Sequence, residues 1–349
     1  MNRKQFRNVF AIGACALSFA SCDPFEPEPE PIVNYNNGVW MINEGGFGQN
    51  NGSITVYSSG VRYADPFLEV NGAPAGDILQ RVIREGNVYV AVNNGGNKVV
   101  VGDASTLKVK YEIAALDYPR DVAVSGEFLY VAQGAMAGKI GKYNLSNGAW
   151  VADVAVGNGP ERLLIVNNQL WVANSGGWLT DNTISVIDLN TFQVQSTLYT
   201  GDRPTDIVWE EQSGRVFVLG MGETLYDANW NISGHTIATL TGFESDLSSF
   251  GQIQVGAEGD HPKYMDVING EILIVNGGVD AYTNTSELIC DDCINGNYYS
   301  IDADTDGNIW LTSVPDYVSN SSVFKYNWST RTLKGNYQGG IATHSVIVP

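Results

Sequence analysis

The sequence predicts an all-β fold, a closed seven-bladed β-propeller with four strands in each blade. Two observations carry this prediction: a strand signature that occurs seven times, and a length that divides into seven units of propeller-blade size. The composition agrees, because 39 glycines among 349 residues are too many for a helical bundle. A hydrophobic content of 44% with only 16% charged residues is also too apolar for disorder.

The repeated signature is an aromatic residue followed by small or branched aliphatic residues. Tyr89-Val90-Ala91, Tyr130-Val131-Ala132 and Trp171-Val172-Ala173 begin 41 residues apart, twice in succession. Related strands occur at residues 39–42, 217–219, 273–275 and 310–312. We therefore expect seven copies of one structural unit.

Each unit is expected to contain three further strands. A strand that opens with Pro precedes the signature at residues 119–124, 160–165, 204–208 and 262–267. Pro fits there because the first residue of a strand need not donate a ladder hydrogen bond. Third strands are expected at residues 52–57, 139–143 and 183–188, and a weaker fourth strand at 151–156. Residues 344–348 are expected to pair with the N-terminal blade and close the ring, so that residues 38–349 form one propeller domain.

The N-terminus carries an export signal. Basic residues at positions 3, 4 and 7 precede an apolar run, and the small residues before Cys22 resemble a lipobox, although Phe19 stands where Leu is usual. We expect residues 1–21 to be removed, Cys22 to be lipidated, and residues 22–37 to form an acidic, Pro-rich tether. Cleavage before Cys15 would leave hardly any apolar core, and simple secretion is the other alternative.

The chain as a whole resembles a known family. The motifs Pro-x-Asp-Ile/Val, Tyr-Val-Ala-Asn and Ile-Ser-Val-Ile-Asp are similar to those of the YncE-like seven-bladed propellers. The lipoprotein signal and the segment 43–48 resemble the BtuG-type surface lipoproteins. This resemblance implies an outer-membrane lipoprotein that captures a corrinoid and delivers it to a TonB-dependent transporter. The acidic residues after Cys22 resemble a surface-export signal, while a plain spacer facing the periplasm is the alternative.

Loops before the first strand and after the second strand of each blade emerge on the same face. We expect the loops after the second strand to be long in blades five and six, at residues 220–234 and 276–297. The candidate ligand-binding residues on this face are Asn43, Glu44, Asn94, Arg120, Arg162, Asn174, Trp178, Arg203, Lys263, Tyr264, Tyr298 and Tyr299. Such an aromatic and amide-rich surface suits a corrinoid, a glycan or a protein partner. Alternatively, Asn only forms turns and Arg pairs with an Asp of the next blade.

Two short motifs suggest other sites. Asp302, Asp304 and Asp306 match the front half of a calcium loop, but Ser313 stands where the loop needs a bidentate Glu, so a plain hairpin turn is the stronger interpretation. Cys290 and Cys293 have the spacing of half a zinc site. In an exported protein, a disulfide at the tip of the blade-six loop is the better prediction.

The sequence does not predict an enzyme, and no required cofactor is expected. It lacks the nucleophile elbow, the zinc-protease motif and a Gly-rich phosphate loop, and its three His residues fall in different blades, with only His261 expected on the binding face. A metal-dependent hydrolase or lyase is the enzymatic alternative. The net charge of −19 argues against nucleic acid and against a membrane contact other than the lipid anchor.

Overall fold

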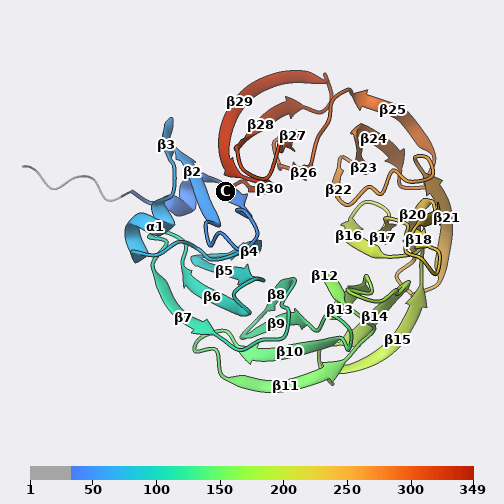
Figure 1. Cartoon of the computed structure of the whole chain (residues 1–349), viewed down its shortest axis with the longest axis horizontal. Coiled ribbons are helices and arrows are strands. Elements are labelled where there is room, and N and C mark those ends of the chain that lie inside the picture. The colour runs from blue at the N-terminus through green and yellow to red at the C-terminus, as the bar shows by residue number, and fades with distance from the viewer. Residues whose placement is uncertain (1–32) are drawn as a thin grey trace, which may run out of the picture. The chain divides into compact units, whose positions relative to one another are not determined.

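Seven four-stranded antiparallel sheets are arranged radially around a central axis in the computed structural model, which describes residues 33–349 (Figure 1). The predicted seven-bladed β-propeller is therefore confirmed. The predicted signal peptide, the lipidation of Cys22 and most of the tether lie outside the described residues. Among the described residues, no helix has the length and apolar character needed to cross a membrane.

The strands of each blade follow one another outward from the axis. Blade 1 contains β30 (Thr343–Ile347), β1 (Val39–Asn43), β2 (Ser53–Ser58) and β3 (Val61–Tyr63). Blades 2 and 3 contain β4 (Leu79–Glu85), β5 (Val88–Asn93), β6 (Lys98–Asp103), β7 (Val109–Ile113), β8 (Val122–Ser125), β9 (Phe128–Gln133), β10 (Lys139–Asn144) and β11 (Trp150–Ala155). Blade 4 contains β12 (Pro160–Val166), β13 (Gln169–Asn174), β14 (Thr183–Asp188) and β15 (Gln193–Tyr199).

The last three blades follow the same plan with one insertion. Blade 5 contains β16 (Pro204–Glu210), β17 (Arg215–Gly220), β20 (Ala238–Phe243) and β21 (Ser249–Val255), and the hairpin of β18 (Thr224–Tyr226) and β19 (Ile232–His235) is inserted between β17 and β20. Blades 6 and 7 contain β22 (Met265–Ile268), β23 (Glu271–Asn276), β24 (Gly278–Thr283), β25 (Leu288–Ile294), β26 (Ser300–Ala303), β27 (Asn308–Ser313), β28 (Asn320–Asn327) and β29 (Thr332–Ile341). The short helices η1 (Tyr35–Asn37) and α1 (Pro66–Asn71) belong to blade 1.

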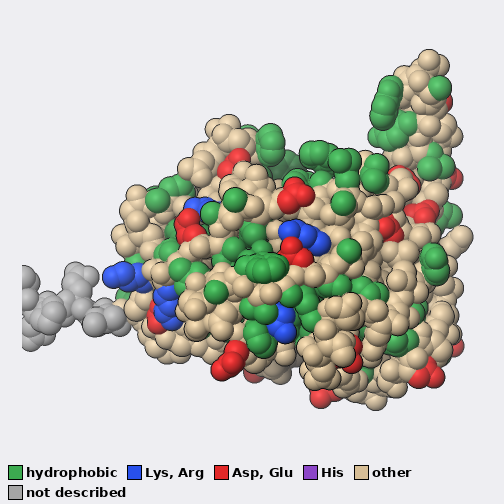
Figure 2. All heavy atoms as spheres, turned by 90° about the horizontal axis from the view of Figure 1, so that it is seen from below, with side chains coloured by type: hydrophobic (Ala, Val, Ile, Leu, Met, Phe, Trp, Pro, Cys, Tyr) green, Lys and Arg blue, Asp and Glu red, His purple; other side chains and the backbone are tan. Residues whose placement is uncertain are grey.

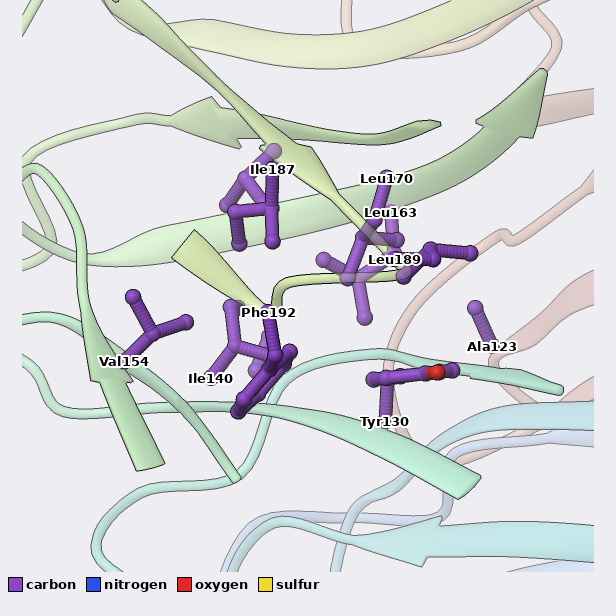
Figure 3. Close-up of a cluster of buried hydrophobic side chains, with 11 residues drawn as sticks. Ala123, Tyr130, Ile140, Val154, Leu163, Leu170, Ile187, Leu189 and Phe192 are labelled. Atoms are coloured by element: carbon purple, nitrogen blue, oxygen red, sulfur yellow. The ribbon is translucent and has the colours of Figure 1, made fainter. Parts of the chain in front are cut away.

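The seven signature segments form the second strand of each blade, and their side chains make the core. They are apolar on both faces because each lies between two neighbouring blades. Between blades 3 and 4, for example, Tyr130 and Ile140 pack with Leu163, Leu170 and Phe192 (Figure 3). Burial of such interfaces stabilises the ring by roughly 25 cal/mol for each Å² of apolar surface removed from water.

The C-terminal strand closes the ring as predicted. β30 pairs antiparallel with β1, so that Met41 lies opposite Val346. Blade 1 thus combines the first and last strands of the propeller, which joins the two ends of the chain in one sheet and closes the ring.

The predicted long loop of blade six is wrong. Residues 276–297 instead form a tight turn at Gly277, whose φ of 77° suits glycine, followed by β24 and β25. Tyr282 is accordingly buried between blades and does not lie on the surface. Cys290 and Cys293 form a disulfide within β25, across a bulge in that outer strand, and not at a loop tip.

Candidate functional site

A cavity of about 360 Å³, here called the mouth well, opens on the axis at the end of the propeller where the second strands finish. Every blade contributes to it, since its lining comprises Glu44, Gln80, Arg120, Glu161, Arg162, Ser175, Arg203, Thr205, Met221, Lys263, Tyr264, Tyr299 and His344. Most of these residues stand just before or at the start of an inner strand, or just after a second strand.

A repeated backbone turn directs side chains toward the mouth. The residue before the Pro that leads into the inner strand has a positive φ in three equivalent positions: Tyr118 (49°), Arg203 (53°) and His261 (53°). Non-glycine residues adopt this left-handed conformation at an energetic cost, and such residues concentrate at functional sites. Ile78 and Ala342 have the same left-handed φ of 52° before the inner strands that begin at Leu79 and Thr343, so the turn occurs without Pro as well.

The mouth well is rich in cationic groups. It contains Arg120, Arg162, Arg203 and Lys263 against Glu44 and Glu161, in a chain with only 19 Lys and Arg residues in total. Arg120 is clamped, because both carboxylate oxygens of Glu161 accept its hydrogen bonds and Gln80 Oε1 accepts another at 2.9 Å. Burial lowers the pKa of Arg120, but the Glu161 carboxylate raises it above its usual value, so the guanidinium stays charged.

Glu44, His344 and two tyrosines form the opposite wall. Tyr299 Oη donates to Glu44 Oε1 at 3.3 Å, and the rings of Tyr264 and Tyr299 are 5.7 Å apart. Burial raises the pKa of Glu44 and of both tyrosines. Burial, followed by Arg81 and Arg162, lowers the pKa of His344 to about 3, so its imidazole is neutral. Neither ring nitrogen of His344 has a hydrogen-bond partner among the described residues.

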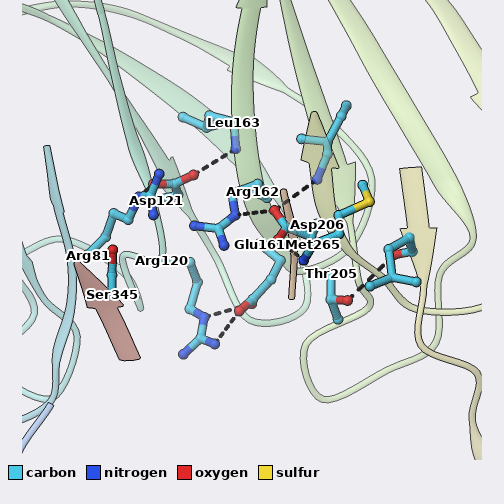
Figure 4. Close-up of polar contacts among 12 residues, drawn as sticks. Arg81, Arg120, Asp121, Glu161, Arg162, Leu163, Thr205, Asp206, Met265 and Ser345 are labelled. Carbon is cyan, nitrogen blue, oxygen red and sulfur yellow. Dashed lines mark hydrogen bonds and ion pairs between the residues drawn. The ribbon is translucent and has the colours of Figure 1, made fainter. Parts of the chain in front are cut away.

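Below the well, inner-strand carboxylates connect neighbouring blades, as Figure 4 shows for Asp121 and Asp206. Asp206, Asp266 and Asp302 line a narrow channel of about 160 Å³. The backbone N–H groups that donate to the inner-strand carboxylates are those of Leu163 to Asp121 (2.8 Å), Met265 to Asp206 (2.9 Å), Ala303 to Asp266 (2.6 Å) and Val346 to Asp302 (2.7 Å). Arg162 Nε also donates to Asp206 at 2.9 Å, across blades 4 and 5. Arg162 therefore pairs with an Asp of the next blade, as the alternative interpretation predicts, and it also lines the well.

A wider and shallower cavity of about 770 Å³, here called the aromatic groove, adjoins the well and shares Arg203 and Met221 with it. Trp178 and Trp230 line the groove and are 71% and 83% exposed. Trp230 belongs to the β18–β19 hairpin, which Figure 2 shows as a projection at the right-hand edge. The face therefore combines a charged well with exposed rings that can stack on a ligand.

The structure brings together eight of the twelve predicted binding residues. Glu44, Arg120, Arg162, Arg203, Lys263, Tyr264 and Tyr299 line the well, and Trp178 lines the groove.

The other four predicted residues lie outside both cavities. Asn43 and Asn174 are fully buried, and their amides donate to hydroxyl groups of the adjacent strand. Asn94 donates to the Pro119 carbonyl, and Tyr298 packs edge-on against Phe324. The amides of Asn43 and Asn174 thus donate within their own blades, whereas the amide of Asn94 links blade 2 to blade 3.

Sequence reasoning missed two histidines of the mouth face. His344 lines the well, while His235 on β19 contacts His261, so all three His residues lie at this face, not His261 alone. In the structure, His344 occupies the same register position as two other residues that line the well. It stands two residues before a backbone amide that donates to an inner-strand carboxylate, as Glu161 and Lys263 do.

The three carboxylates of the calcium candidate do not converge. Asp302 lines the channel, while Asp304 accepts from Asn308 N and Trp310 Nε1 within the β26–β27 turn, and Asp306 is exposed. Across residues 33–349, no group of three or more His, Cys, Asp and Glu side chains is arranged as a metal site. Asp304 therefore stabilises the β26–β27 turn, in agreement with the interpretation of this segment as a plain hairpin turn.

The fold and the mouth define the class, a seven-bladed β-propeller with a recessed site on its axis. Residues 37–257 match the family described as Domain of unknown function (DUF5074), and the chain belongs to that family. A search of curated protein sequences found no match.

Solved structures share the fold at low identity. A quinonprotein alcohol dehydrogenase-like protein from Bacteroides thetaiotaomicron is 13% identical with a TM-score of 0.61, over 90% of this chain and 79% of that chain. BamB from Moraxella catarrhalis is 15% identical with a TM-score of 0.57, over 91% and 88%. The computationally designed protein Ika8 is 11% identical with a TM-score of 0.59, over 89% and 91%. At these identities the likeness concerns the fold alone.

Proposed function

We propose that this protein is a binding protein that captures a bulky ligand at the mouth, and that the ligand is a corrinoid. One observation carries the proposal: the charged well and the aromatic groove adjoin each other and share Arg203 and Met221 in their linings. A corrinoid combines a broad macrocycle with many carboxamides and a phosphate. Arg and Lys donors suit the carbonyl and phosphate oxygens, and exposed Trp rings suit the apolar faces of the macrocycle.

Preorganisation supports tight capture. The well is built on the ends of packed strands, and Arg120 is held by Glu161 and Gln80 before any ligand arrives. Little conformational entropy is then lost on binding.

Titration with cyanocobalamin tests the proposal, with red colour co-eluting with the purified protein on gel filtration as the first readout. Trp178→Ala and Trp230→Ala should each weaken binding tenfold or more, since removing an aromatic anchor costs about 2 kcal/mol. Trp150→Ala is the matched control, because Trp150 is 63% exposed but lies on the outer strand β11. Absence of co-elution, or equal losses in all three variants, would contradict the proposal. Saturable binding of an oligosaccharide at the same tryptophans would favour the glycan alternative.

Anchoring and delivery belong to the same proposal. The pattern at Cys22 supports a lipidated protein at the outer membrane, which would pass its ligand to a TonB-dependent transporter. Incorporation of labelled palmitate that Cys22→Ser abolishes would support the anchor, and protease treatment of intact cells would report its orientation. Unchanged labelling of the Cys22→Ser variant would exclude lipidation at this residue.

A further inference from the structure

Three electron-pair donors form a compact triangle in the wall of the aromatic groove. His235 Nδ1 and His261 Nε2 are 3.1 Å apart, and Thr224 Oγ1 lies 3.1 Å from His261 Nε2 and 3.3 Å from His235 Nδ1. Thr224 and His235 face each other across the β18–β19 hairpin, whereas His261 comes from the loop before β22. The triangle therefore joins the hairpin of blade 5 to blade 6.

The hydrogen bonding of His261 fixes which of its nitrogens is free. His261 Nδ1 is 2.9 Å from the Met221 carbonyl oxygen, which can only accept a hydrogen bond. In the neutral imidazole Nδ1 therefore carries the hydrogen, and the lone pair of Nε2 points into the triangle. A backbone carbonyl that holds the second ring nitrogen in this way is the usual support of a metal-binding histidine.

We propose that His235, His261 and Thr224 bind a divalent transition-metal cation of the zinc, nickel or copper type. Two imidazole nitrogens that bind one Zn²⁺ at 2.0–2.1 Å in tetrahedral geometry are roughly 3.3 Å apart, close to the separation of the two His nitrogens here. Imidazole ligands favour these metals over calcium and magnesium. Thr224 and His261 both line the groove, so the remaining coordination positions face the space where a ligand would lie.

Two carboxylates lie near the triangle. Glu223 lines the same groove, where its Oε1 is 3.9 Å from Arg203 Nη1, and Glu258 Oε1 accepts a hydrogen bond from the backbone N–H of His235 at 3.2 Å. Because one donor is a hydroxyl group and the site is open, we expect weaker binding than at a closed site with four strong ligands. This site does not depend on the corrinoid proposal, and either can fail without the other.

Isothermal titration of the chelator-treated protein with ZnCl₂, NiCl₂ or CuSO₄ alone tests the site. We expect saturable binding of one cation, weakened at least tenfold in His235→Ala and in His261→Ala. His344→Ala is the matched control and should bind as the wild type does, because His344 lies in the well and not in the triangle. Absence of saturable binding of all three metals, or unchanged binding in both triangle variants, would overturn the proposal.

A measurement on the wild-type protein tests the site without relying on variants in which the β18–β19 hairpin has lost its structure. With ¹⁵N-labelled histidine, Zn²⁺ should shift the ring-nitrogen resonances of two residues and leave the third unchanged, and the His344→Ala spectrum identifies the third. If the triangle is only a set of hydrogen bonds, none of the His235 and His261 resonances will move with zinc, and the proposal is wrong.

Discussion

Replacing Asp302 with Asn should remove a pH dependence of stability between pH 7 and pH 9. Asp302 lies on β26, where Val346 N donates to one carboxylate oxygen at 2.7 Å and Ser345 Oγ donates to the other at 3.1 Å. Burial in the narrow channel, and next the Asp266 carboxylate, raise the pKa of Asp302 to about 8. The folded protein therefore holds a proton that the unfolded chain has already lost.

The sign of the effect follows from this difference in bound protons. The unfolded carboxyl group is ionised throughout the range, so the free energy of unfolding falls as pH rises through the folded pKa. With a folded pKa of about 8, the loss between pH 7 and pH 9 amounts to about 1.4 kcal/mol. Asp266, whose pKa burial raises to about 6, and His344, with a pKa of about 3, contribute little in this window.

Urea unfolding at pH 7, 8 and 9, followed by tryptophan fluorescence at constant ionic strength, measures the effect. The amide side chain of the Asp302→Asn variant keeps a carbonyl oxygen for the Val346 N–H but cannot ionise, so the decline of about 1.4 kcal/mol should vanish. Asp306→Asn is the control, because Asp306 is exposed in the turn that follows β26, and it should decline with the wild type. A wild type that is flat across this range, or a parallel decline of the Asp302→Asn variant, would refute the reasoning.

Two further predictions concern the channel and the well. Asp121→Ala should lower the free energy of unfolding by about 3 kcal/mol in urea titrations, since it leaves the Leu163 amide unsatisfied and Arg81 unpaired. A loss under about 1 kcal/mol would contradict the role of Asp121 in linking two blades. Arg203→Gln should weaken cyanocobalamin binding without changing the melting temperature. Arg162→Gln should weaken binding and also lower the melting temperature, because Arg162, unlike Arg203, has a close buried carboxylate partner. Equal melting temperatures of the two variants would count against this.

Much of the fold could be predicted from the sequence because the second strand of every blade is buried on both faces and therefore reads as an apolar run. Blade six shows where this fails. β24 and β25 carry Asp280, Asp291 and Asp292, and the register of their pairing shifts twice, so no regular alternation marks them as strands. Only the pairing with β23 reveals that they complete the blade.

The candidate site was predictable where a Pro in the sequence shows the position at which an inner strand begins. The Pro residues that lead into inner strands locate Arg120, Arg162, Arg203 and Lys263, and all four line the well. Spacing cannot distinguish an Asn that faces solvent from one that faces a neighbouring strand, and the structure buries Asn43 and Asn174 against the adjacent strand. The contact of His235 with His261 depends on how the hairpin folds back, and no local pattern encodes it.

Hydrogen exchange measured with and without cyanocobalamin tests most directly whether the mouth is the binding site. We predict new protection in the segments that surround the well and the groove, residues 176–181, 221–236 and 261–264, with unchanged exchange in the outer strand β11. Protection confined to the outer strands or to the opposite face would contradict the account.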